Sequence, residues 1–228
     1  NGNYIKISKN HQFYMTEILE NIFASSFHTL DNYQSILLVG PDGCGKTSIG
    51  RWIADIYSSY LKKKLNLSKD NDYKFYICNP EMTISDIIGR YVPCKQDKTS
   101  NSNFLSDSPI EWMFGPVIEA LKNGDCLILD QIDTAPSTIL ERLNPLFDGL
   151  GEKDFKFQIH ENLENPEVLV NPMFRIIAIS SLSGLNNLSP AFLNRFTIIY
   201  VNEQLNFIND NLIKFVRCLS PYSNSNML

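Results

Sequence analysis

The segment at residues 40–47 constrains this chain more than any other feature. It reads Gly-Pro-Asp-Gly-Cys-Gly-Lys-Thr and fits the pattern G-x-x-x-x-G-K-[ST] in full. An apolar run at 36–39 leads into it, and a helical pattern from about 46 to 63 follows it. Glycines in such a loop let backbone N–H groups surround phosphate oxygens, and the start of the following helix adds a positive dipole. The sequence therefore predicts a phosphate-binding loop between a buried strand and a helix.

Two side chains of this loop have predicted roles toward a nucleoside triphosphate. We expect the Lys46 ammonium to contact the β- and γ-phosphates and the Thr47 hydroxyl to bind Mg²⁺. The alternative is a glycine-rich turn that binds nothing, and it requires the strand, the lysine and the threonine to coincide by chance. The predicted nucleotide-binding residues are Gly40, Pro41, Asp42, Gly43, Cys44, Gly45, Lys46, Thr47 and Ser48.

A second candidate lies about eighty residues further on, where an apolar strand at 126–129 ends in Asp130. Nucleotide sites in open α/β sheets lie at the carboxyl ends of the strands. An apolar strand that ends in Asp is usually structural when it occurs alone, but the complete loop upstream favours a metal role. We therefore predict that Asp130 binds Mg²⁺ opposite Thr47.

The residue after Asp130 bears on turnover. Many NTPases have Glu there, which orients and deprotonates the attacking water, whereas this chain has Gln131. An amide is similar in shape but cannot take a proton. Asp133 is the nearest carboxylate, and we favour a role for it as a helix cap or turn residue before Pro136. Gln131 is thus the candidate at the catalytic position, and we expect hydrolysis to be slow or absent.

Two further catalytic candidates follow later strands. Ser180 and Ser181 end a predicted strand at 175–179, where a polar side chain can reach the γ-phosphate or the water; ordinary turn chemistry is an equal alternative. We take Ser181 as the candidate of the pair. Arg195 lies at the end of a short helix before a strand at 197–201. It either stabilises phosphoryl-transfer charge in a neighbouring subunit or caps its own helix.

The remaining pattern alternates helices with strands. Helical spacing occurs at 11–30, 82–88, 116–122 and 136–147, a further strand is predicted at 74–78, and the alternating stretches 155–159 and 167–170 predict a hairpin. Strands that alternate with helices favour a parallel sheet covered on both faces. We predict a three-layer α/β fold.

Composition excludes several classes. The 228 residues are 43% hydrophobic with a net charge of −5, which argues against dominant disorder and against generic nucleic-acid binding. No apolar run reaches the ~20 residues of a membrane span. The five cysteines are odd in number and lack metal-ligand spacing, which favours a reducing intracellular compartment. The first residues show no signal peptide, and we expect a piece of a longer chain.

Together these features resemble an AAA+ module. The resemblance rests on the phosphate loop, the strand ending in Asp130, the two-strand insertion, and the segment Leu-Ser-Pro-Ala-Phe-Leu-Asn-Arg-Phe at 188–196. It extends from about Tyr4 to Val201. Four stretches resemble, more narrowly, the midasin/MoxR-like branch of this family: 79–93, 112–130, 140–148 and 171–175.

The resemblance implies an ATP-binding core at 1–201, with a β-hairpin insertion before the sensor strand, and the start of a truncated helical lid at 202–228. It is similar to one module of the midasin family, dynein-related proteins with six AAA+ modules in one chain. This implies ATP and Mg²⁺ as cofactors and neighbouring AAA+ modules in a ring as partners. It also implies a role in the nucleus in remodelling pre-60S ribosomal particles. Gln131 departs from the family pattern, and the second sensor arginine has no assigned position.

Two other functions remain open. The first is a non-hydrolysing structural module whose bound nucleotide stiffens a ring; Gln131 favours it, whereas Arg195 and a polar sensor candidate favour activity. The second is a module of a dynein motor or of a MoxR-type chaperone ATPase. The rest of a longer chain would distinguish this second alternative from the midasin family.

Overall fold

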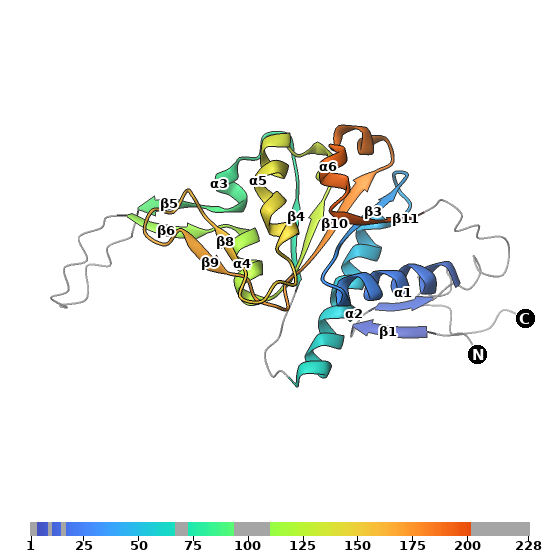
Figure 1. Cartoon of the computed structure of the whole chain (residues 1–228). Helices are drawn as coiled ribbons and strands as arrows, with labels where there is room; N and C mark the ends of the chain where they lie inside the picture. Colours follow the sequence, from blue (N-terminus) through green and yellow to red (C-terminus); the bar gives the residue numbers. More distant parts are fainter. Residues whose placement is uncertain (1–3, 9–10, 15–16, 67–72, 94–109, 202–228) are drawn as a thin grey trace, which may run out of the picture.

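The computed structural model describes residues 4–8, 11–14, 17–66, 73–93 and 110–201. The lid predicted at 202–228 lies outside these residues. The fold is built on a parallel sheet of five strands in the order β11-β3-β10-β7-β4, which confirms the α/β prediction (Figure 1). These strands are β3 (Ser35–Gly40), β4 (Tyr73–Ile77), β7 (Cys126–Asp130), β10 (Arg175–Ser181) and β11 (Phe196–Tyr200).

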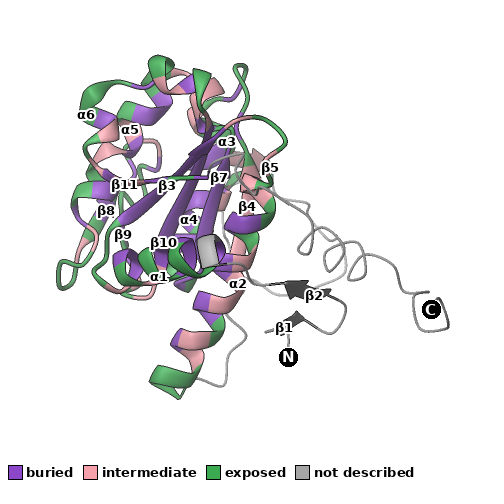
Figure 2. Ribbon diagram, turned by 90° about the vertical axis from the view of Figure 1, so that its right-hand side faces the viewer, coloured by how far each residue is buried: buried purple, intermediate pink, exposed green. Residues whose placement is uncertain are grey.

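Helices cover both faces of the sheet. One face packs against α1 (Glu17–Asp31) and α2 (Lys46–Leu65), and the other against helices that follow later strands (Figure 2). The second group comprises α3 (Ile84–Ile87), α4 (Pro116–Asn123), α5 (Ser137–Asp148) and α6 (Pro190–Leu193). No helix among the described residues has the length and hydropathy needed to cross a membrane.

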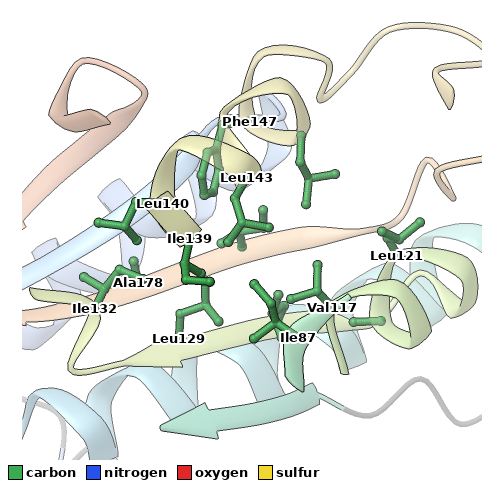
Figure 3. Close-up of a cluster of buried hydrophobic side chains, with 14 of the residues drawn as sticks. Ile87, Val117, Leu121, Leu129, Ile132, Ile139, Leu140, Leu143, Phe147 and Ala178 are labelled. Atoms are coloured by element: carbon green, nitrogen blue, oxygen red, sulfur yellow. The ribbon is translucent and has the colours of Figure 1, made fainter. Parts of the chain in front are cut away.

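Successive side chains of a strand point to opposite faces of the sheet, so the hydrophobic core consists of two clusters, one on each face. In β3, Leu37 and Val39 join the hydrophobic cluster beneath α4 and α5, whereas Ile36 and Leu38 join the cluster beneath α1 and α2. Figure 3 shows the first cluster, in which Leu129 and Ala178 of the sheet lie near side chains of α5. Every residue of β3 is buried, as expected for a strand covered on both sides.

Three antiparallel strand pairs lie outside the central sheet. The pair β8 (Lys156–Gln158) and β9 (Glu167–Leu169) confirms the predicted insertion before β10. The pair β5 (Gly89–Pro93) and β6 (Ile110–Phe114) was not predicted, because its strands are short and sixteen residues separate them in the sequence.

The predicted helix at 11–30 is wrong over its first turn. Residues His11–Tyr14 form β2, which pairs with β1 (Tyr4–Ser8), and α1 begins only at Glu17. An aromatic-rich segment has good strand propensity. Once 4–8 supplies a partner backbone, strand pairing prevails over helical spacing.

Register aligns the strand ends that matter for function. Ser181 of β10 pairs with Gly40 of β3, and Ile77 of β4 pairs with Asp130 of β7. Because the strands are parallel, these ends lie at one edge of the sheet. Two short 3₁₀ helices begin there, η1 (Ile132–Thr134) after β7 and η2 (Ser183–Asn187) after β10.

Candidate nucleotide-binding site

A pocket of about 530 Å³ lies at this carboxyl edge of the sheet. Six of the nine predicted loop residues line it, together with Asp130, Gln131 and Ser181. Gly40, the last residue of β3, does not line it, and neither do Pro41 and Cys44. The structure thus brings the predicted loop, the strand-end carboxylate and the sensor candidate to a single cavity.

Two glycines give the loop its shape. Gly43 and Gly45 have φ angles of 80° and 87°, in the left-handed region that glycine adopts without strain. A Cβ built at either would meet no atom of the described residues within 4 Å, so the requirement is for backbone conformation rather than for room. Gly45 is the N-cap of α2, and the loop therefore opens directly onto the positive end of that helix.

Lys46 is held by the loop's own carbonyls. Its Nζ donates to Gly40 O at 2.8 Å and to Pro41 O at 2.7 Å, and it lies 3.8 Å from Asp42 Oδ1. A phosphate oxygen carries a negative charge and therefore attracts the Lys46 ammonium more strongly than a neutral carbonyl oxygen does. Phosphate oxygens in the pocket can therefore displace the carbonyls as acceptors.

Thr47 and Asp130 meet as the sequence predicts. The Thr47 hydroxyl donates to Asp130 Oδ2 at 2.9 Å, and Asp130 Oδ1 accepts from the backbone N–H of Gln131 at 3.0 Å. A hydroxyl and a carboxylate are hard oxygen ligands of the kind that Mg²⁺ binds, so the pair fits this ion. Bound Mg²⁺ would polarise phosphate oxygens as a Lewis acid.

The segment after β7 turns sharply. Gln131 has φ 56° and ψ 43°, a left-handed conformation, and it precedes η1. The Thr134 hydroxyl donates back to Gln131 O at 2.9 Å and stabilises this turn. Thr134 also lines the pocket; it was not predicted, although a threonine three residues after a turn residue is a signal of such turns.

Asp133 lies in the turn after β7, within η1, and does not cap α5. Its Oδ2 accepts from the Ser181 hydroxyl at 2.9 Å, and the side chain lines the pocket. The sequence predicted a helix cap or a turn residue, and the structure shows the turn residue: the turn at Gln131 directs this carboxylate toward β10 rather than toward the start of α5.

The serines that end β10 have different partners. Ser180 is buried, and its hydroxyl donates to Ser181 O at 3.0 Å. The Ser181 hydroxyl donates a hydrogen bond to Asp133 Oδ2 and accepts one from the backbone N–H of Gly184 at 2.9 Å. Both serines line the pocket, so they lie where the sequence placed them.

Arg195 is not part of this pocket. Its Nε and Nη2 donate to the two carboxylate oxygens of Asp148, each at 2.8 Å, and its Nη1 donates to Ala191 O at 2.6 Å. The hydrogen bonds that Arg195 donates to the Asp148 carboxylate raise the pKa of Arg195. In this structure Arg195 therefore caps α6 and joins it to the end of α5.

Cys78 is buried in the hydrophobic core next to the end of β7. Its backbone N–H donates to Asp130 O at 2.8 Å. Burial, together with the charges of Asp130 and Asp133, raises the pKa of the Cys78 thiol to about 12. The thiol is thus neutral and packs in the core as a small apolar side chain.

Solved structures support the fold. The chain is 16% identical to NtrX from Brucella abortus, whose structures were determined in complex with ADP and with ATP. The TM-scores are 0.50 and 0.51, over 83% and 84% of this chain and 37% of NtrX. At this identity the likeness establishes the AAA+ fold and no more.

The curated relatives include midasins from two organisms. The chain is 27% identical to midasin of Dictyostelium discoideum over 82% of its own length, and 28% identical to midasin of Giardia intestinalis over 80%. It spans about 4% of the length of each midasin. It is also 26% identical to an uncharacterised protein of Staphylococcus aureus, over 85% of this chain and 65% of that protein.

A family model covers most of the chain. Residues 35–196 match the AAA domain of the dynein-related subfamily. This range begins with the first residue of β3 and ends with the first residue of β11, so it contains four of the five strands of the central sheet and every residue that lines the pocket. The chain therefore belongs to the dynein-related subfamily of AAA domains and is an AAA+ ATPase module related to midasin.

Proposed function

We propose that this chain binds ATP with Mg²⁺ in the pocket at the carboxyl edge of the sheet and hydrolyses it slowly. The observation that carries the proposal is the contact between Thr47 and Asp130, 83 residues apart in sequence and 2.9 Å apart in space. Beside this pair, Lys46 supplies a positive charge and the start of α2 a positive dipole. Triphosphate and metal thus have complementary partners in one cavity.

The proposal extends to the larger protein. We propose that this module works in a ring with neighbouring AAA+ modules, in a midasin-like protein of the nucleus that remodels pre-60S ribosomal particles. The relation to two midasins supports it, as does the small share of those chains that this module spans. Arg195 lies outside the pocket of its own chain, as expected of an arginine that serves a neighbour. A dynein motor and a MoxR-type chaperone ATPase are the alternatives for the parent protein.

A second candidate function is a structural module that keeps its nucleotide. Gln131 favours it, because an amide cannot accept a proton from water. The proton of the Ser181 hydroxyl is also directed to Asp133 rather than into the pocket. In this case ATP would stiffen the ring without being turned over.

Calorimetric titration of ATP in Mg²⁺ tests the binding proposal. We expect the unaltered chain to bind one ATP, and Lys46→Ala to lose nearly all affinity because the phosphates lose their cation. Lys63→Ala is the matched control, since Lys63 is an exposed lysine in the last turn of the same helix. An unaltered chain that binds no ATP, or equal losses in both variants, would contradict the proposal.

A further inference from the structure

The pocket contains three carboxylates, and they differ in what their oxygens do. Asp130 has both oxygens engaged, by Thr47 and by the backbone of Gln131. Asp42 is largely exposed and lies near Lys46. Asp133 accepts from Ser181 through Oδ2 only; within the described part of the chain no donor contacts Oδ1. Asp133 therefore keeps a carboxylate oxygen with unused acceptor capacity at the pocket wall.

The turn after β10 is shaped around this carboxylate. A Cβ added at Gly184 would overlap the Asp133 carboxyl group, so only glycine leaves room for it. The backbone N–H of Gly184 donates to the Ser181 hydroxyl at 2.9 Å, and Ser183 Oγ lies 3.2 Å from the same hydroxyl. These contacts orient the Ser181 hydroxyl, which in turn donates to Asp133 Oδ2. Two segments 48 residues apart thus hold one carboxylate in place.

We propose that Asp133 is the catalytic carboxylate of this module, which accepts a proton from the attacking water through Oδ1, and that Ser181 is the positioning residue that holds it. This inference rests on the proposed function. It explains how the module can hydrolyse ATP slowly although residue 131 is an amide. The carboxylate that takes the proton lies two residues further along the chain.

The step balances as follows in atoms and charge. The water oxygen forms a bond to the γ-phosphorus while the bond from that phosphorus to the β–γ bridging oxygen breaks. The bridging oxygen leaves with the electron pair as part of ADP. One water proton passes to Asp133 Oδ1 and from there to the released phosphate or to solvent.

Single-turnover phosphate release, with the chain in excess over ATP, tests the proposal. Asp133→Asn keeps an acceptor for Ser181 but cannot take a proton. We expect it to lower the rate about 10²-fold, the low end of general-base contributions, while ATP affinity and melting temperature stay unchanged. Asp154→Asn is the matched control, since Asp154 is exposed and does not line the pocket. Equal rates in the unaltered chain and Asp133→Asn would overturn the proposal.

Two further variants separate chemistry from structure. Ser181→Ala removes one hydrogen bond to a charged group, so we expect a rate loss of about tenfold, and Ser181→Thr should restore the rate because it restores the hydroxyl. Adding Gln131→Glu to Asp133→Asn supplies a new carboxylate and should recover the rate. A loss of rate that no added carboxylate recovers would assign Asp133 a structural role and overturn the proposal.

The outcomes also separate this inference from the proposal on which it rests. If the unaltered chain binds ATP but releases phosphate no faster than Lys46→Ala, the module is a non-hydrolysing one and the role of Asp133 is wrong. If the unaltered chain binds no ATP, the proposed function itself fails.

Discussion

The two ends of β10 use polar side chains in opposite ways. At its start, Arg175 is buried and donates to Leu30 O at 2.6 Å, and to Pro172 O and Phe174 O, each at 2.8 Å. Its guanidinium lies 4.2 Å from the centre of the Tyr33 ring. At the other end, Ser180 and Ser181 face the nucleotide pocket.

The difference concerns where hydrogen-bonding capacity is used. Arg175 donates to a backbone carbonyl of α1 and to two carbonyls of the loop before β10, so it stabilises the fold. At the carboxyl edge, Lys46 donates only to neutral carbonyls among the described residues. Asp133 Oδ1 has no donor within the described part of the chain. One strand thus separates a stabilising end from a ligand-binding end, and substitutions at the two ends should have separate consequences.

Further stabilising hydrogen bonds join the two helices α1 and α2, which pack against the same sheet. The Tyr57 hydroxyl donates to Asp31 Oδ1 at 3.0 Å, and the Tyr60 hydroxyl to Asp31 Oδ2 at 3.2 Å. Burial raises the pKa of Tyr57, so its hydroxyl stays protonated and continues to donate. This network joins α1 to α2 far from the pocket.

The largest expected effect comes from Arg175→Met. The substitution removes the guanidinium donor from three carbonyls, two of which belong to buried residues, and hydrogen bonds to charged groups contribute about 1.5–3 kcal/mol each. We expect the free energy of unfolding, measured with urea, to fall by about 3 kcal/mol, while ATP affinity stays within a factor of about two. A large loss of ATP affinity in the folded variant would show that the two ends are not separate.

A smaller effect is expected from Thr47→Ala, which acts on the ligand-binding end. Loss of the hydroxyl removes one predicted Mg²⁺ ligand, so ATP should bind about tenfold more weakly in Mg²⁺, or about 1.4 kcal/mol. Titrations with and without EDTA check the cause, since the variant should respond little to metal removal. An unchanged response to EDTA would contradict a metal role for Thr47.

Gln131→Glu should raise turnover only modestly in the isolated chain. Asp133 already supplies a proton acceptor, and the arginine of a neighbouring module, worth ~10³–10⁵ in other phosphoryl-transfer systems, is absent there. Steady-state phosphate release, with Lys46→Ala as background, measures the change. Rapid turnover by the unaltered chain alone would show that no neighbour is needed.

The smallest expected effect on the pocket comes from Arg195→Ala. Arg195 pairs with Asp148 and does not line the cavity, so the ATP affinity of the chain should be almost unchanged. A tenfold loss, about 1.4 kcal/mol, would show that this residue acts on nucleotide in its own chain or holds the pocket in shape.

Local sequence signals predicted most of the fold and the placement of Thr47 and Asp130 at one edge of the sheet. The apolar strands, the loop at 40–47 and the carboxylate at Asp130 each depend on neighbours in sequence, and parallel pairing brings them together. The strand at His11–Tyr14 was missed because its formation depends on pairing with Tyr4–Ser8 rather than on its own pattern.

The contact of Asp133 with Ser181 and that of Arg195 with Asp148 could not be predicted, although the cap that Arg195 forms on its own helix was one of the two alternatives. Asp133 meets Ser181 only because β7 and β10 are neighbours and the turn at Gln131 adopts a left-handed conformation. Arg195 finds Asp148 across 47 residues, where α5 ends beside α6. Side-chain partners between distant elements depend on packing geometry that no local pattern encodes.

The most direct test is the rise in melting temperature that ATP and Mg²⁺ produce in the unaltered chain, in Arg175→Met and in Lys46→Ala. Ligand that binds only the folded state adds about 2.7 kcal/mol of stability at a hundredfold excess over the dissociation constant. We predict a lower starting temperature but a full ATP-dependent rise in Arg175→Met, and a normal starting temperature without a rise in Lys46→Ala. No rise in the unaltered chain, or an equal rise in Lys46→Ala, would contradict the account.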